Sequence, residues 1–162
     1  MDPIRYVDTL NDHYRSLGNP PYRWSINETA PLHRLTKPLS ECTVSVLTSG
    51  GVSQCGASAF NPNALNDHRL DAIPADAVSS DFQVHDNYYD HTDAEADINC
   101  IFPLERLREF AERKEIGRVA PRLWSGFMGR IYNRSKIAQE SGPEFAKALQ
   151  ADNVDILLAA PS

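Results

Sequence analysis

Apolar positions along the chain predict strands and helices in alternation. Residues 42–48, CTVSVLT, are rich in β-branched side chains, which is typical of a strand. Residues 153–162 contain the near-continuous apolar run ILLAA between turn residues, a pattern typical of a parallel strand covered on both faces. Shorter strands are expected at 82–85 and at 118–124, where Pro121 would interrupt the second one.

Helical spacing of apolar side chains appears in three other segments. Residues 2–17 place isoleucine, valine, tyrosine and leucine near one face, and residues 104–115 do the same with leucine and phenylalanine. Ser141 followed by Glu144 has the spacing of a capping box, which predicts the start of a helix that runs through Leu149.

The order of these elements predicts an α/β fold with an open, partly parallel sheet flanked by helices. A long polar excursion occupies residues 56–81. Residues 1–40 are expected to form an N-terminal helix and an extended arm, whose Tyr22 and Trp24 would cover either the chain's own core or a partner subunit. Residues 41–162 would form the α/β domain, which apparently lacks its C-terminal part because no helix follows the last strand.

Composition narrows the classes of function. The 162-residue chain has a net charge of −6, which argues against nucleic acid or an anionic membrane as its main partner. It contains no apolar run of about 18 residues that would predict a transmembrane helix, and no signal-peptide pattern. Three cysteines without metal-ligand spacing fit a reducing environment, so a cytoplasmic location is expected.

Small residues follow the first strand directly, at Ser49, Gly50 and Gly51. Such residues can allow backbone N–H groups to approach a ligand, but paired glycines are common in tight turns, which is the interpretation we favour. The chain lacks a G-x-G-x-x-G fingerprint, so a dinucleotide cofactor of the Rossmann type is not expected.

The densest group of polar side chains spans residues 85–93, HDNYYDHTD. Its histidines and carboxylates could bind a substrate by acid–base chemistry or hold a metal ion. The same residues could instead form a loop in which Asp and Asn side chains bond to nearby backbone. The sequence leaves these three alternatives open.

The cysteines offer no convincing nucleophile. Cys42 and Cys100 lie in apolar surroundings and are expected to be buried, whereas Cys55 follows the glycine-rich stretch and is expected to be exposed.

Several segments together resemble the selenoprotein B family of glycine, sarcosine, betaine and D-proline reductases, especially its short, D-proline-reductase-like members. The block from His85 to Leu104 is the most specific. The other similar segments are PPYRW at 20–24, KPL at 37–39, TSGGV at 48–52, IP at 73–74 with Asp81, EIG at 115–117, AP at 120–121, GFMG at 126–129 and VD at 154–155.

The resemblance implies reductive cleavage of a carbon–nitrogen bond by a selenocysteine or cysteine with a second thiol nearby. It also implies a small amino-acid-like substrate and, in the D-proline enzyme, a second subunit with a pyruvoyl group. The reactive residue of similar proteins follows the strand that matches residues 154–162. We therefore expect the stop after Ser162 to be an in-frame UGA that is, or descends from, a selenocysteine codon, and the chain alone to be inactive.

Two further hypotheses remain: a non-catalytic binding or assembly subunit of such a reductase, and a metal-dependent hydrolase that uses residues 85–93. The candidate substrate-binding residues are Ser49, Gly50, Gly51, His85, Asp90, His91 and Asp93. No catalytic residue and no metal ligand is assigned within the chain.

Overall fold

A computed structural model describes residues 5–22, 26, 28–29 and 33–161. The helices are α1 Tyr6–Ser16, α2 Thr92–Ala96, α3 Leu104–Glu112, α4 Arg134–Lys136 and α5 Gly142–Ala151, with short turns η1 Leu39–Glu41, η2 Ser79–Asp81, η3 Ile98–Cys100 and the π-helical η4 Ile137–Ser141. The strands are β1 Thr43–Thr48, β2 Val52–Gln54, β3 Leu70–Pro74, β4 Phe82–Val84, β5 Arg118–Val119, β6 Arg122–Gly126 and β7 Ile156–Ala160.

Strand β1 lies inside the main sheet. It pairs in parallel with β7 on one side, and with β5 and then β6 on the other. Pro121 separates β5 from β6 because proline has no N–H to donate to the ladder. β3, from within the long polar excursion, pairs antiparallel with β6. The predicted α/β fold and partly parallel sheet are confirmed, and the strands at 43–48 and 156–160 are direct parallel neighbours.

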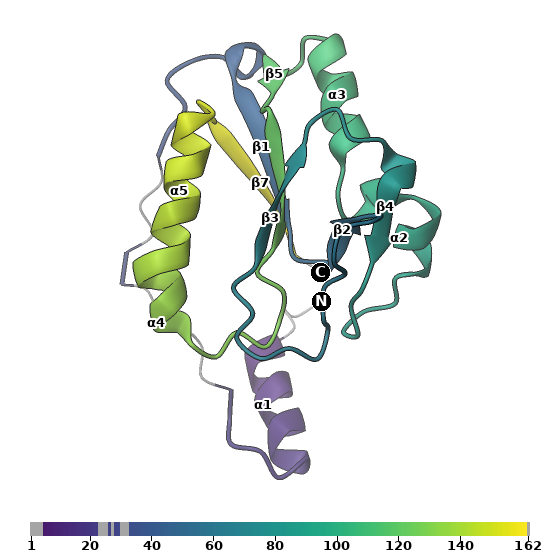
Figure 1. The fold of residues 1–162 in the computed structure, drawn as a ribbon. Helices are drawn as coiled ribbons and strands as arrows, with labels where there is room; N and C mark the ends of the chain where they lie inside the picture. The colour runs from purple at the N-terminus through teal and green to yellow at the C-terminus, as the bar shows by residue number, and fades with distance from the viewer. Residues whose placement is uncertain (1–4, 23–25, 27, 30–32, 162) are drawn as a thin grey trace. The chain divides into compact units, whose positions relative to one another are not determined.

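Helices cover the two faces of this sheet, with α5 on one side and α3 on the other (Figure 1). The main hydrophobic core is on the α3 side, where Leu104 and Leu107 pack with Val44 and Val46 of β1. Burying each of these side chains stabilises the fold by about 1.5–3 kcal/mol. On the α5 side, the Phe145 ring packs edge-on against Trp124 at 5.2 Å.

A second, two-stranded sheet extends from the end of β1. There β2 pairs antiparallel with β4, and Phe82 of β4 packs edge-on against the buried Phe102 at 5.6 Å. This small sheet brings residues 82–85 next to the chain that leaves β1, so it positions the polar segment discussed below.

Two sequence-based expectations about these elements are wrong. β7 is not covered on both faces: Leu157 and Leu158 are 37% and 42% exposed, because among the described residues β7 pairs only with β1 and forms an edge. Ser141 does not cap a helix, because its backbone is already helical at the end of η4. The helical course begins earlier, at Arg134, where the side chain of Asn133 accepts from the N–H of Lys136 at 3.3 Å.

Contacts divide the chain into two units, residues 1–34 and 35–162. In the first unit, α1 confirms most of the predicted N-terminal helix, and the Tyr22 N–H donates to Asn11 Oδ1 at 3.0 Å. The start of that helix, Trp24 of the arm, and Ser162 lie outside the described residues.

No helix within the described part of the chain has the length and apolarity needed to cross a bilayer.

Candidate functional site at the carboxyl end of the central strands

Residues 49–51, here called the glycine turn, carry the chain from β1 to β2. The Ser49 N–H faces the Ala160 carbonyl oxygen of β7 at 3.4 Å, and the Gly50 N–H donates to Thr48 Oγ1 at 3.2 Å. Both N–H groups therefore have partners within the protein. This bonding favours the tight-turn interpretation of the glycines over a cradle of free N–H donors.

Residues 85–93, here called the polar segment, reach the glycine turn directly. The His85 N–H donates to the Gly51 carbonyl oxygen at 3.0 Å, and the Tyr89 hydroxyl donates to the Gly50 carbonyl oxygen at 2.8 Å. Gly51 has φ +68°, and a Cβ there would lie 2.2 Å from the His85 carbonyl oxygen. Only glycine allows this close approach of two backbones.

Tyr89 is the ionisable group that its surroundings alter most at this junction. Burial raises the pKa of Tyr89 to about 12, and the negative charges of Asp86 and Glu95 add to the increase. Asp86 is itself buried, and its Oδ1 accepts from the Tyr88 N–H at 2.7 Å. The Tyr89 phenol therefore remains a protonated hydrogen-bond donor even at pH values at which an ordinary tyrosine ionises.

The remaining candidate side chains of the polar segment have their hydrogen-bond and charge partners away from the glycine turn, although the His91 ring also packs edge-on against Tyr89 at 5.9 Å. Asp90 accepts from the hydroxyl and the N–H of Thr92, and these hydrogen bonds hold the pKa of Asp90 below its usual value. His91 Nδ1 lies 2.7 Å from Glu95 Oε1, one helical turn further along. Asp93 is exposed in the first turn of α2.

The polar segment is therefore largely a loop held by its own carboxylates, one of the three alternatives left open by the sequence. Of the seven candidate residues, the structure brings together Ser49, Gly50, Gly51 and His85. Asp90 and Asp93 lie at the start of α2, and the His91 ring packs edge-on against Tyr89. Among residues 5–22, 26, 28–29 and 33–161, no three His, Cys, Asp or Glu side chains gather as metal ligands. The metal-dependent hydrolase hypothesis thus gains no support from these positions.

Buried polar atoms without partners lie around this junction, two of them in strands. Ser53 Oγ, His85 Nδ1 and Ser125 Oγ are all buried, and none has a hydrogen-bond partner among the described residues. Ser125 is the Cα partner of Thr48 in the sheet, and Ser53 lies two residues after Gly51. Sequence reasoning missed Tyr89 and these serines. Serines in otherwise apolar strands were the available signal.

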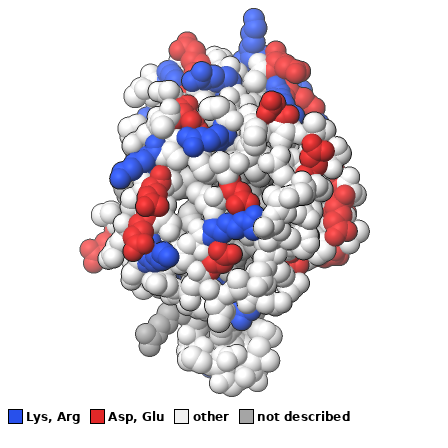
Figure 2. Space-filling model, viewed as in Figure 1, with Lys and Arg blue, Asp and Glu red and all other residues white. Residues whose placement is uncertain are grey.

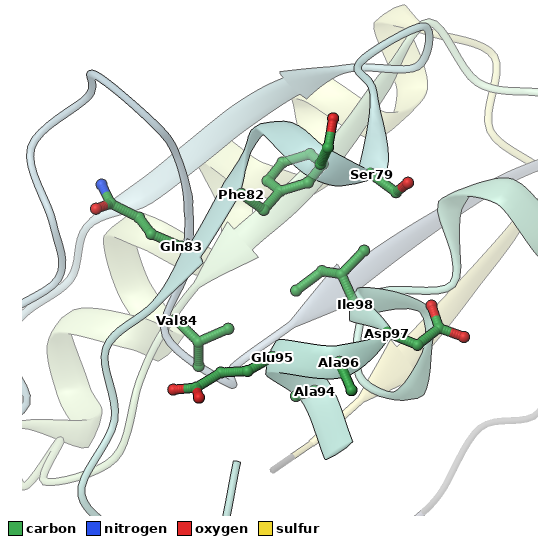
Figure 3. A pocket seen from close by; sticks show the side chains of 10 residues that line it. Ser79, Phe82, Gln83, Val84, Ala94, Glu95, Ala96, Asp97 and Ile98 are labelled. Carbon is green, nitrogen blue, oxygen red and sulfur yellow. The ribbon is translucent and has the colours of Figure 1, made fainter. Parts of the chain in front are cut away.

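A cavity of about 500 Å³ adjoins the polar segment between β4 and α2 (Figure 3). It is lined by Ser79, Ser80, Phe82, Gln83, Val84, Ala94, Glu95, Ala96, Asp97 and Ile98. Figure 3 shows Phe82 and Val84 on one side, Ile98 and Ala94 on the other, and the Glu95 and Asp97 carboxylates set apart from each other. No residue of the polar segment is among the described residues that line this cavity, but Glu95 of the lining contacts His91.

The cysteines contribute no reactive pair. Cys42 is fully buried and Cys55 is exposed, as expected. The prediction of a buried Cys100 is wrong: it ends the turn η3, which directs Ile98 inward and leaves Cys100 at the surface. All three thiols are free.

Acidic and basic side chains are interspersed on the face shown in Figure 2, without a broad field of one sign. The face in view therefore offers no extended basic surface of the kind that binds nucleic acid.

Comparison with known proteins supplies the family. The sequence profile described as glycine/sarcosine/betaine reductase selenoprotein B matches residues 21–160. The chain is also 36% identical over 124 residues to D-proline reductase subunit gamma of Acetoanaerobium sticklandii, a match that covers 76% of this chain and 50% of that relative. The chain thus spans about half the length of this curated relative. No solved structure matches it. The chain belongs to the glycine/sarcosine/betaine reductase selenoprotein B family, and D-proline reductase subunit gamma is one of its relatives.

Proposed function

We propose that this chain is the part of an amino-acid reductase that frames the redox site and binds a small amino-acid-like substrate. One observation carries the proposal: the ends of β1 and β7 meet the polar segment at the glycine turn. Ser49 contacts Ala160 of β7, while Gly50 accepts from Tyr89. Sites of open α/β sheets form at this end of the strands.

The proposed reaction breaks a carbon–nitrogen bond with two electrons and two protons, so that carbon and nitrogen each gain a hydrogen. Dithiols supply the electrons. A selenolate or low-pKa thiolate attacks, and a second thiol resolves the product as a disulfide-like bond. Family resemblance puts this pair after β7, and the residue that follows β7 would emerge beside Ser49. The cytoplasm, with reduced thiols, is the proposed location.

In the proposed site, Ser49, His85 and Tyr89 lie where the ends of β1 and β7 meet the polar segment. Tyr89 keeps the glycine turn in place through its hydrogen bond to Gly50, and its neutral phenol presents no negative charge to the incoming thiolate. His85 contributes the one ring nitrogen of the segment that is buried without a partner. A second subunit is proposed to carry the pyruvoyl group that activates the amine.

The test begins with the reading frame beyond the Ser162 codon. If that frame encodes a selenocysteine or cysteine with a nearby second thiol, the longer product should show dithiothreitol-dependent ring opening of proline or release of amine from glycine-type substrates. The 162-residue chain should show neither. Turnover by the 162-residue chain itself, or a UAA or UAG stop followed by no such frame, would contradict the proposal.

A matched pair of variants tests the site in the longer product. Tyr89→Phe removes the hydroxyl that donates to Gly50, so we expect at least a ten-fold loss of kcat/KM. Tyr88→Phe removes a neighbouring exposed hydroxyl and should leave activity unchanged. Equal activity of both variants would exclude the glycine turn from the site.

The exposed apolar side chains of β7 favour a second candidate, a non-catalytic subunit that binds or assembles on a separate redox subunit. Leu157 and Leu158 are available for such an interface. In that case the 162-residue chain would restore activity when mixed with a separately encoded redox subunit. The first proposal requires the redox pair on the same polypeptide.

A further inference from the structure

A second cavity, of about 330 Å³, lies between the end of β6 and α5, on the sheet face opposite the main core. Its lining residues are His68, Leu70, Trp124, Phe127, Ser141, Glu144, Phe145 and Ala148. No side chain of the glycine turn or of the polar segment lines it. A cavity of this size admits a molecule with a single ring.

Three aromatic rings give the cavity its shape. Phe145 packs edge-on against Trp124 at 5.2 Å and against Phe127 at 6.1 Å. Phe127 has φ +51°, a left-handed conformation that is uncommon for a bulky residue. Its N–H donates to the Arg69 carbonyl oxygen at 3.1 Å, which helps hold this conformation and keeps the ring at the cavity wall.

Two hydrogen-bonding atoms of the lining lack partners among the described residues. Trp124 is 5% exposed, and its Nε1, which can only donate, is buried without an acceptor. His68 Nε2 is also buried without a partner, while His68 Nδ1 lies 3.4 Å from Ser141 Oγ. When Ser141 donates to Nδ1, the proton of a neutral His68 is on Nε2, which gives the residues of the lining a second unpartnered donor.

The charges around the cavity select against an anion. None of the described lining residues is Lys or Arg, and Glu144 is acidic. Arg122 lies over the Trp124 ring at 5.1 Å, but its charge is paired with Asp152 through hydrogen bonds of 2.8 and 2.9 Å. A carboxylate would enter without a compensating cation, whereas a neutral carbonyl would satisfy the same donors.

We propose that this cavity is a binding site for a small, uncharged, flat molecule whose carbonyl oxygen accepts hydrogen bonds from Trp124 and His68 and whose ring packs against Phe127 and Phe145. The site is separate from the glycine turn and the polar segment, and the proposal does not depend on the proposed function.

Three probes of nearly the same shape test the ligand class: benzamide, benzoate and benzylamine, which are neutral, anionic and cationic at pH 7. Trp24→Phe leaves Trp124 as the single tryptophan of the chain, so its fluorescence reports binding. Benzamide should bind with a dissociation constant on the order of 1 mM, and the charged probes at least about ten-fold more weakly.

Two substitutions on one helix locate the site. Ala148→Leu fills the cavity and should abolish benzamide binding, whereas Ala146→Leu makes the same change at an exposed position of α5 and should leave it intact. Trp124→Phe keeps an aromatic ring but removes the donor, so it should weaken binding about five-fold when followed by ligand-observed NMR.

Circular dichroism verifies that each variant is folded, and Trp124→Phe provides the test if Ala148→Leu does not fold. The proposal is overturned by any of three results: no saturation by benzamide below about 20 mM, equal binding of the three probes, or binding that both cavity variants leave unchanged.

Discussion

Lys37 and Asp155 form an ion pair, with Nζ 2.7 Å from Oδ2, that connects the segment before β1 to the residue before β7. The same Asp155 oxygen accepts from the Thr43 N–H at 2.7 Å, and the Asp155 N–H donates to the Thr43 carbonyl oxygen at 2.9 Å. The two parallel strands are thus fixed at their first residues, and Val44 pairs with Ile156.

Asp155→Asn should lower the midpoint of thermal unfolding at pH 7. The hydrogen bond from Lys37 and that from the Thr43 N–H hold the pKa of Asp155 below its usual value. A lowered pKa in the folded state stabilises the protein above the unfolded value of about 3.9, and the contribution disappears as pH falls through the folded pKa. The difference between variant and wild type should therefore shrink below about pH 4. Asp76→Asn, at an exposed carboxylate, is the control.

Comparing Gly51→Ala with Gly56→Ala separates the cost of backbone strain from the cost of a steric clash. Both glycines have positive φ, +68° and +87°, so backbone strain alone should cost about 1–2 kcal/mol at each position. A Cβ at Gly56 meets nothing within 4 Å, but at Gly51 it would lie 2.2 Å from the His85 carbonyl oxygen. Gly51→Ala should therefore destabilise the protein by about 3 kcal/mol or more in urea unfolding. Equal losses would show that the polar segment can move away from the glycine turn.

Tyr89→Phe removes the hydrogen bond to Gly50 and should lower the free energy of unfolding by about 0.5–1.5 kcal/mol at pH 7. Since the pKa of Tyr89 is raised to about 12, its contribution is complete below about pH 10 and is lost as the pH rises toward 12. Ultraviolet titration should show one late-titrating phenol in the wild type that is missing in the variant. Tyr88→Phe should retain it.

Asn133→Ala should cost about 1 kcal/mol because the Asn133 side chain caps the helical course that begins at Arg134. Ser141→Ala should cost less than Asn133→Ala, since Ser141 lies inside that course and caps nothing, and its hydroxyl has only the long 3.4 Å contact with His68 to lose. Chemical denaturation of the two variants distinguishes the observed helix start from the capping box that the sequence predicts. The opposite ranking would restore the capping box.

The pattern of side chains was sufficient to predict those strands and helices whose residues carry a clear signal of their own. The β-branched run at 43–48 and the amphipathic helix from Leu104 formed where expected. β3 escaped prediction because its residues, LDAIP, have no clear alternation and depend on pairing with β6. The exposure of β7 also depends on its place in the sheet, which a sequence pattern does not report.

The candidate site was likewise predictable in part. The sequence predicted the position of the glycine turn after a parallel strand, but it did not predict which groups its N–H donors bond to. The N–H of Ser49 and that of Gly50 face partners inside the protein. Asp90 and His91 share a short segment with His85, yet only the folded chain shows that Tyr89 is the side chain that reaches Gly50. Side-chain direction over a few loop residues is set by packing.

The pairing of β1 with β7 has a kinetic consequence. Thr43 and Asp155 are 112 residues apart, and β5 and β6, the other partners of β1, also follow it at long range. Loop closure over such separations makes pairing slow. During synthesis, the apolar β1 leaves the ribosome well before any of its partners exists, so the nascent chain must be shielded until β6 is made. Late protection of the β1 amides in pulsed hydrogen exchange would mark this order of assembly.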